Sequence, residues 1–229
     1  GSLSKGKLRG VGFIFVLCFL ISSVLFLPID VEYVIYAILL FAMMISGYLD
    51  DASKTPWNEY KKGLIDLVIS VVAVLTYMNF NSTTICFGAD EIVIPKALFL
   101  ILGVILIWVS VNVTNCTDGV DGLCASLCSV TLLAFGVLFA PILQKYAMAN
   151  FLFLSVLFAY LYFNSSPSSM LMGDAGSRAL GFYIAVIALK STHPFIYILL
   201  AAVMIVDGGI GLVKIALKRF LKISILKKT

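Results

Sequence analysis

Residues 97–114, with the sequence ALFLILGVILIWVSVNVT, contain no charged side chain and no proline. An α-helix rises about 1.5 Å per residue, so roughly 20 mostly apolar residues cross the hydrocarbon core of a bilayer. An uninterrupted apolar stretch of this length therefore predicts a transmembrane helix. Polar residues begin at its end and continue through residues 114–122, TNCTDGVDG, so the predicted helix stops beside two Asp-Gly pairs.

The composition of the whole chain agrees with this interpretation. Hydrophobic residues make up 62% of the 229 residues and charged residues 12%, against roughly 45–50% and about 25% in soluble domains. A soluble fold of this size cannot bury so much apolar surface and still cover itself with polar groups. The composition excludes a soluble globular protein, a disordered chain and a disulfide scaffold, and it indicates an all-α polytopic membrane protein.

Eight apolar stretches are long enough, or nearly long enough, to form transmembrane helices. They cover residues 10–28, 32–49, 63–79, 97–114, 122–143, 147–163, 178–190 and 194–213, and the seventh is the shortest. Between the third and fourth, the alternating run Glu91-Ile92-Val93-Ile94 predicts a small extramembrane β-hairpin. Residues 1–229 show no internal repeat or linker, which predicts one membrane domain.

The cationic residues are divided unevenly between the two sides that eight spans define. One side carries 13 of the 16, among them Lys62 and Arg178, and the other carries Lys96, Lys145 and Lys190. The positive-inside rule then places both ends of the chain and the 13-cation side in the cytoplasm. Lysines recur every four residues over 214–222, so residues 213–228 predict a basic amphipathic helix at the inner leaflet.

Carboxylates gather on the same predicted side. Asp50 and Asp51 end the second span, Asp118 and Asp121 lie between the fourth and fifth, and Asp174 precedes the seventh. Carboxylates at membrane depth are costly, so several at one level indicate a functional site. Like charges held close together need a neutralising cation. Mg²⁺ is the natural partner, because the sequence offers no His/Cys cluster.

Two of these acidic segments also combine glycines with the start of a predicted helix. Asp118 and Asp121 are each followed by glycine just before the fifth span, and Asp174 follows Gly173 just before the seventh. Glycine permits tight turns and close approach of a ligand to the backbone, and helix N-termini attract phosphate groups. Together these segments predict a site for a metal-bridged phosphate.

Three motifs resemble those of the polyprenyl-phosphate hexosamine-1-phosphate transferases, membrane enzymes that start bacterial cell-wall polymers. The motifs are Gly47-Tyr-Leu-Asp50-Asp51, Asn115-Cys-Thr-Asp118-Gly-Val-Asp121-Gly-Leu123, and Asn164-Ser-Ser-Pro167 through Met172-Gly-Asp174-Ala-Gly-Ser177. They occur in the family's order and spacing and span most of the chain. Thr117, before the first Asp-Gly, is typical of the phospho-N-acetylmuramoyl-pentapeptide transferase branch.

This resemblance implies a reaction and a setting. Undecaprenyl phosphate attacks the β-phosphate of UDP-MurNAc-pentapeptide, giving lipid I and UMP, with Mg²⁺ as the cofactor. The enzyme lies in the lipid bilayer of the bacterial inner membrane, with its active site on the cytoplasmic face. It is commonly a homodimer and a target of uridine-based nucleoside inhibitors, and no nucleic-acid partner is expected. The family has ten spans, and we expect the eight here to be its second to ninth, without the first and without the His-containing loop that follows the amphipathic helix.

The resemblance also implies roles for individual residues. Asp174 resembles the Mg²⁺ ligand, Asp50 the residue proposed to deprotonate the lipid phosphate, and Asp51 a polar or metal-side partner of this catalytic set. Leu171 stands where the family often has an aromatic residue that stacks on uracil. The expected contacts with nucleoside, sugar and anionic groups are Asn112, Asn115, Asp118, Gly119, Asp121, Asn164, Lys54 and Lys61 (or Lys62).

Three other functions remain open at this stage. The first is a GlcNAc-1-phosphate transferase of the same superfamily. The second is a cation-coupled transporter, which would also carry intramembrane carboxylates, although these belong near the bilayer midplane. The third is a structural scaffold in a cell-wall assembly complex, descended from the enzyme.

Overall fold

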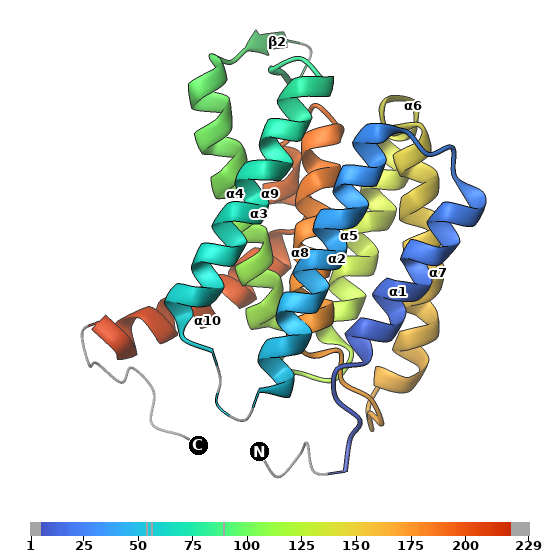
Figure 1. The fold of residues 1–229 in the computed structure, drawn as a ribbon, viewed down its shortest axis with the longest axis vertical. Helices are drawn as coiled ribbons and strands as arrows, with labels where there is room; N and C mark the ends of the chain where they lie inside the picture. Colours follow the sequence, from blue (N-terminus) through green and yellow to red (C-terminus); the bar gives the residue numbers. More distant parts are fainter. Residues whose placement is uncertain (1–5, 54, 56, 89, 221–229) are drawn as a thin grey trace.

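A computed structural model describes residues 6–53, 55, 57–88 and 90–220. Helices run back and forth between two ends (Figure 1). We call the end where residues 53–58, 118–122 and 165–172 connect helices the site end, and the end with the β-hairpin the hairpin end. The helices are α1 Val11–Phe26, α2 Val31–Ala52, α3 Glu59–Phe80, α4 Lys96–Thr117, α5 Leu123–Leu138, α6 Ala140–Leu143, α7 Lys145–Asn164, α8 Gly173–Lys190, α9 Ile196–Leu200 and α10 Ala202–Phe220.

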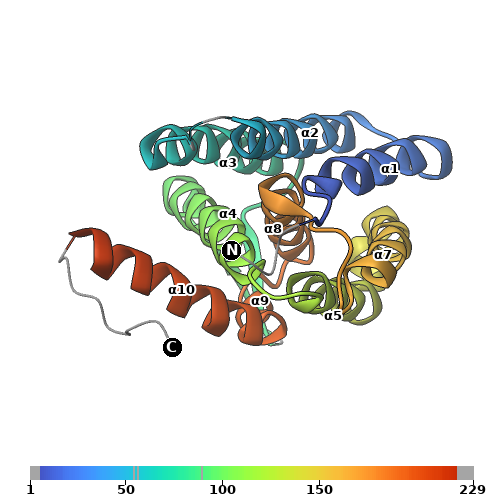
Figure 2. The same ribbon diagram turned by 90° about the horizontal axis from the view of Figure 1, so that it is seen from below.

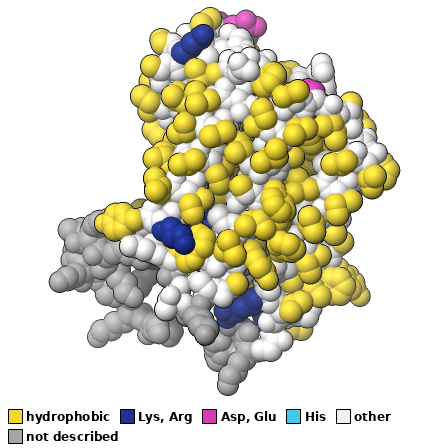
Figure 3. Space-filling view, in the orientation of Figure 1, with side chains coloured by type: hydrophobic (Ala, Val, Ile, Leu, Met, Phe, Trp, Pro, Cys, Tyr) yellow, Lys and Arg dark blue, Asp and Glu magenta, His cyan; other side chains and the backbone are white. Residues whose placement is uncertain are grey.

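The prediction of a polytopic membrane protein is confirmed. Within the described part of the chain, four helices, α2, α3, α4 and α7, are long and apolar enough to cross a membrane, and α1 and α5 are shorter apolar helices of 16 residues. Hydrophobic side chains cover the middle of the face shown in Figure 3, while charged side chains lie toward its two ends. Such an apolar band flanked by charges is the surface that a bilayer requires.

The predicted hairpin is present, formed by strand β1, Thr84–Phe87, and strand β2, Asp90–Val93. The two strands are antiparallel, with Thr84 opposite Val93 and Phe87 opposite Asp90. Gly88, in the connection, has a φ of 65°, which a side chain would disfavour. The backbone N–H of Cys86 donates to the carbonyl of Thr192 at 2.8 Å, which fixes the hairpin to the end of α8.

Several helix boundaries differ from the prediction, each for a local reason. Helix α8 starts at Gly173, five residues earlier than expected, and so includes Asp174 in its first turn. The fifth span is interrupted at Phe139, just before Pro141, which has no N–H to donate to the preceding turn. The last span is broken at Ala201 between α9 and α10.

Helix α10 then continues without a break to Phe220. The described part of the predicted amphipathic segment, residues 213–220, is therefore the end of α10, which runs obliquely to the other long helices (Figures 1 and 2). Residues 221–228 of that segment lie outside the described part of the chain.

Helix α8 lies at the centre of the bundle, surrounded by the other long helices (Figure 2). Residues 175–189 of this helix are all buried. Glycines allow its neighbours to approach closely: a Cβ added at Gly12 on α1 or at Gly47 on α2 would collide with the backbone of α8, and one at Gly181 would lie 2.6 Å from the carbonyl oxygen of Ser110 on α4. Small residues at helix contacts are the usual basis of packing in membranes, where lipid supplies no hydrophobic drive.

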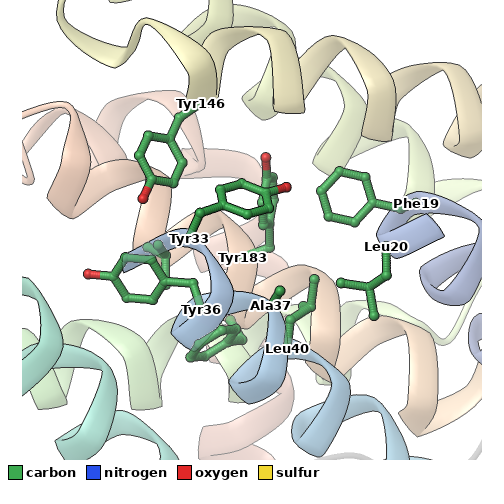
Figure 4. A pocket seen from close by; sticks show the side chains of 10 residues that line it. Phe19, Leu20, Tyr33, Tyr36, Ala37, Leu40, Tyr146 and Tyr183 are labelled. Carbon is green, nitrogen blue, oxygen red and sulfur yellow. The ribbon is translucent and has the colours of Figure 1, made fainter. Parts of the chain in front are cut away.

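Toward the hairpin end, aromatic side chains from α1, α2, α7 and α8 fill the space around α8 (Figure 4). Tyr33, Tyr36, Tyr146 and Tyr183 line a cavity of about 10 Å³, which leaves room for about one water molecule. Tyr36 precedes Asp50 by 14 residues on α2, or about 21 Å along the helix axis. The cavity is part of the core packing and is remote from the acidic residues at the site end.

An ion pair closes the hairpin end. Lys190, at the end of α8, donates to both carboxylate oxygens of Glu32 at 3.0 Å and to the side-chain oxygen of Asn81 at 2.7 Å. Glu32 lies in the first turn of α2, and Asn81 caps the C-terminus of α3. These contacts tie three helices together at the predicted outer side.

Two adjacent glycines on α10 provide a test of the packing. A Cβ at Gly208 would collide with the carbonyl of Val113 on α4, whereas a Cβ at Gly209 would meet nothing within 4 Å. We predict that Gly208→Ala lowers the free energy of unfolding by ~1–3 kcal/mol through overpacking. Gly209→Ala should leave it unchanged or raise it by up to about 1 kcal/mol, because alanine favours helix. Reversible unfolding in mixed micelles measures both, and equal effects would contradict the close contact between α10 and α4.

Candidate active site

Two of the predicted carboxylates share one lysine at the site end. The Lys62 ammonium contacts the carboxylate of Asp50 and lies 3.4 Å from Oδ2 of Asp174. Asp50 is 6% exposed and also accepts a hydrogen bond from the backbone N–H of Trp57 at 2.7 Å. Lys62 is on α3, Asp50 on α2 and Asp174 on α8, so this cluster brings together three helices.

Asp51 holds the N-terminus of α8. Its Oδ2 accepts a hydrogen bond from the backbone N–H of Asp174 at 2.8 Å. A carboxylate at this position satisfies an N–H that the helix cannot pair and lies at the positive end of the helix dipole. Gly173 makes the approach possible: its φ is 66°, and an added Cβ would collide with the Asp51 carboxylate. The structure thus gives Asp51 a definite task, which is to fix the first turn that carries Asp174.

The loop between α4 and α5 faces the same turn of α8. Burial raises the pKa of Asp118 to about 7, and the nearby Asp174 and Asp51 carboxylates contribute to the rise. Asn115 also meets α8, since its Oδ1 accepts a hydrogen bond from the Ser177 hydroxyl at 2.9 Å.

Asn164 braces two loops rather than projecting into open space. Its Oδ1 accepts from the backbone N–H of Gly122 at 3.0 Å, and its Nδ2 donates to the carbonyl of Met170 at 2.8 Å. The side chain is 3% exposed. Asn164 thereby connects the loop after Asp118 to the segment that leads into Asp174.

The N-terminal segment joins these loops from outside the bundle. Lys7 Nζ donates to the Asp121 carboxylate at 2.8 and 3.0 Å and to the Ser168 hydroxyl at 2.6 Å. Leu8 forms a parallel β-bridge with Met170, and the backbone N–H of Leu171 donates to the carbonyl of Leu8 at 2.8 Å. The hydrogen bond from Lys7 holds the pKa of Asp121 below its ordinary value.

The remaining predicted site residues lie at the edge of the site or apart from it. Lys61 lies over the Trp57 ring, 3.4 Å from the ring centroid, and it is Lys62 that contacts the carboxylates. Asn112 donates to the carbonyl of Trp108 on its own helix. Gly119 is exposed, with open space where a side chain would be, and Leu171 is half-buried in the segment before Asp174. Lys54 lies outside the described residues.

Sequence reasoning left Lys62 only as an alternative to Lys61 and assigned no role to Lys7 or Ser168. The signal for Lys62 was its spacing, four residues before Asp66 on one helix face, which points it into the bundle. Nothing in the sequence pairs Lys7 with Asp121, because the two are 114 residues apart. Arg178, grouped with the cations of the cytoplasmic side, is 2% exposed and lies inside the bundle.

The carboxylate set fits a Mg²⁺ ion that is shared with a ligand. Among the described residues, no three His, Cys, Asp or Glu side chains converge on one point. Mg²⁺ needs no such cage, since it commonly binds through one or two carboxylates together with phosphate oxygens. Asp50 and Asp174 supply hard oxygen donors and already share one positive charge, that of Lys62.

The comparisons with known proteins agree with this site. Residues 33–192 match the model of glycosyl transferase family 4. A phospho-N-acetylmuramoyl-pentapeptide-transferase of Treponema pallidum (strain Nichols) is 36% identical over 247 residues, covering 98% of this chain and 68% of that protein. Transferases of the same name from Microcystis aeruginosa and Wolinella succinogenes are 31% and 29% identical, covering 80% and 86% of this chain and 53% and 63% of their own lengths.

The chain therefore belongs to glycosyl transferase family 4. The matched residues include Asp50, Asp51, Asp118, Asp121 and Asp174, and so these five carboxylates lie within the family region.

The contact between Lys7 and Asp121 predicts a pH dependence. The pKa of Asp121 is lower in the docked segment than its ordinary value of 3.8, so the contact stabilises docking fully at pH values above 3.8. This stabilisation is lost as the pH falls through the lower pKa of the docked state. Amide exchange of residues 6–12, corrected for intrinsic rates, should be slow at pH 7 and should become progressively faster as the pH is lowered below about 4. In Lys7→Met it should already be fast at pH 7, and in the control Lys61→Met it should match the wild type. Wild-type protection in Lys7→Met would show that the backbone bridge alone holds the segment.

Proposed function

We propose that this protein transfers phospho-MurNAc-pentapeptide from UDP-MurNAc-pentapeptide to undecaprenyl phosphate, giving lipid I and UMP in peptidoglycan synthesis. The main support is the convergence of Asp50, Lys62 and Asp174 at the N-terminus of the buried helix α8. The names of the family relatives agree with this activity.

The reaction demands little covalent chemistry from the protein. An oxygen of the lipid phosphate attacks the β-phosphorus of the UDP-sugar, the bond from that phosphorus to the bridging oxygen breaks, and UMP leaves with the electron pair. Phosphoryl transfer of this kind depends mainly on positioning and on neutralising charge. The site end supplies both, through a lysine, several carboxylates and the first turns of α5 and α8.

Asp174 is the proposed Mg²⁺ ligand, with Asp50 beside it. When bound, the ion supplies charge neutralisation at the pyrophosphate. Asp51 keeps Asp174 in place by accepting the N–H of that residue at 2.8 Å. Asp50 is the proposed acceptor of a proton from the lipid phosphate. Lys62, which contacts both carboxylates, is proposed to neutralise negative charge on the phosphate groups.

The donor nucleotide is proposed to bind on the opposite side of this cluster. The loop there carries Asp118, Gly119 and Asp121, of which Gly119 is exposed and the other two are half-buried. Asn164 joins this loop to the segment that carries Leu171. Asn164 and Lys7 then act by fixing the two loops between which a nucleoside would lie.

The membrane setting completes the proposal. The bundle lies in the bacterial inner membrane with its site end in the cytoplasm, because that end carries most of the cations. We propose that it forms a homodimer and binds uridine-based nucleoside inhibitors at the Asp118–Leu171 side of the site.

Exchange of labelled UMP into UDP-MurNAc-pentapeptide, with undecaprenyl phosphate in detergent, tests the activity. We expect exchange in the wild type that depends on added Mg²⁺. Asp174→Asn should abolish it while keeping the folded structure, because the side-chain volume is preserved. Lys62→Met should reduce it at least 100-fold, whereas the matched control Lys61→Met should reduce it less than fivefold.

Other outcomes of the same assay would contradict the proposal. Exchange with UDP-GlcNAc in place of UDP-MurNAc-pentapeptide would identify a GlcNAc-1-phosphate transferase. Substantial activity of Asp174→Asn at saturating Mg²⁺ would place the ion elsewhere. Equal losses of exchange in the two lysine variants would show that Lys62 has no greater role in the reaction than Lys61.

Leu171 tests the proposed uridine pocket. An aromatic ring stacked on a base contributes ~1–3 kcal/mol in nucleic-acid complexes. We predict that Leu171→Phe leaves exchange largely intact and lowers the Kd of a uridine-based inhibitor several-fold. If Leu171 instead packs only against protein, phenylalanine would overpack the site. A lower Tm with an unchanged Kd would then exclude Leu171 from the pocket.

A further inference from the structure

Two ion pairs, one helical turn apart, join α3 to α8. Lys62 on α3 meets Asp174 on α8, and Asp66 on α3 meets Arg178 on α8. On each helix the two residues are four positions apart and so lie on one face. Both helices start at the site end, so the pairs form a ladder with two rungs.

The second rung is buried within the bundle. The Arg178 and Asp66 side chains are 2% and 4% exposed. Nη1 of Arg178 is also buried and has no hydrogen-bond partner among the described residues. A buried ion pair that is incompletely hydrogen-bonded is a poor source of stability, and apolar residues of similar size commonly pack as well or better. Stability alone therefore does not account for this pair.

The polarity of the two rungs is reversed. The base is on α3 in the first rung and on α8 in the second. If α3 moved one turn along α8 toward the hairpin end, Lys62 would face Arg178. If it moved one turn the other way, Asp66 would face Asp174. Either displacement brings like charges together, so this arrangement disfavours the neighbouring registers as well as favouring the observed one.

The start of α3 has few buried side chains. Of residues 60–68, only Asp66 is buried, while Tyr60 and Leu64 are 81% and 62% exposed. The deeper part of the helix does pack closely, for example through Ile69 and Ala73. The first turns, which carry Lys62, are thus held by the ladder together with the contacts of Asp50 with Lys62 and with the Trp57 N–H just before the helix.

We propose that Asp66 and Arg178 are positioning residues, which select the register of α3 on α8 that holds Lys62 between Asp50 and Asp174. The effect on turnover rests on the proposed transferase function. The register does not, so it is tested separately.

A cross-linking experiment measures the register without any activity. In Lys62→Cys/Asp174→Cys the first rung is gone and the second remains. A short bifunctional thiosulfonate should join these two cysteines efficiently, as identified by mass spectrometry of the peptides. Adding Asp66→Leu/Arg178→Leu should lower the yield at least fivefold. The control pair Glu32→Cys/Lys190→Cys, which joins α2 to α8 at the hairpin end, should cross-link equally in both backgrounds.

Kinetics then test the consequence in the otherwise wild-type chain. Asp66→Leu/Arg178→Leu should keep a Tm close to that of the wild type while kcat for exchange falls at least tenfold and KM for the UDP-sugar changes less than threefold. Arg178→Lys should recover most of kcat. If the leucine variant does not fold, Asp66→Asn/Arg178→Gln replaces it in both experiments with the same expected results.

The outcomes separate the two proposals. A folded double variant with an unchanged cross-linking yield overturns the role of the ladder, and so does one with unchanged kcat. A fall in cross-linking together with no exchange by the wild-type chain would support the register and overturn the transferase function.

Discussion

The close packing of α8 against its neighbours is the constraint on which the rest of the structure depends. Residues 175–189 of this helix are buried, and glycines at Gly12, Gly47 and Gly181 let backbones approach where any side chain would collide. In a membrane such contacts replace the hydrophobic drive of a soluble core. Because α8 cannot shift within this packing, its first turn is a fixed reference, and Asp51 completes it by accepting the N–H of Asp174.

The charges at the site end are placed relative to that turn. Lys62 neutralises Asp50 and Asp174 from one side, while Asp118 faces the same turn from the other and its pKa rises to about 7, through burial first and the neighbouring carboxylates second. Such a cluster holds more negative charge than one lysine balances. That imbalance is suited to a divalent cation and an anionic substrate, since both can be exchanged during a reaction.

Two side chains, one from a family motif and one from the N-terminal segment, hold the loops around this cluster in place. Asn164 joins the Gly122 N–H to the Met170 carbonyl, and Lys7 joins Asp121 to Ser168. Both therefore fix these loops relative to each other. In this family member, Asn164 thus serves to position loops, while Gly119 is exposed and Asp118 and Leu171 are half-buried.

The sequence by itself determined the membrane class, the helices and the hairpin, because these depend on composition, on the length of apolar runs and on the hydrophobic pattern. It also placed Asp50, Asp118 and Asp174 at one end, because successive spans cross the membrane in opposite directions. The motifs also indicated the family. Only the tertiary structure decided that Lys62 and not Lys61 meets the carboxylates, that Lys7 reaches Asp121, and that Arg178 lies inside the bundle against Asp66. Each of these contacts depends on a partner far along the chain. A rotation of a helix by 100°, which is one residue, would point a different side chain at that partner. Packing between helices fixes this rotation, and local sequence patterns do not encode it.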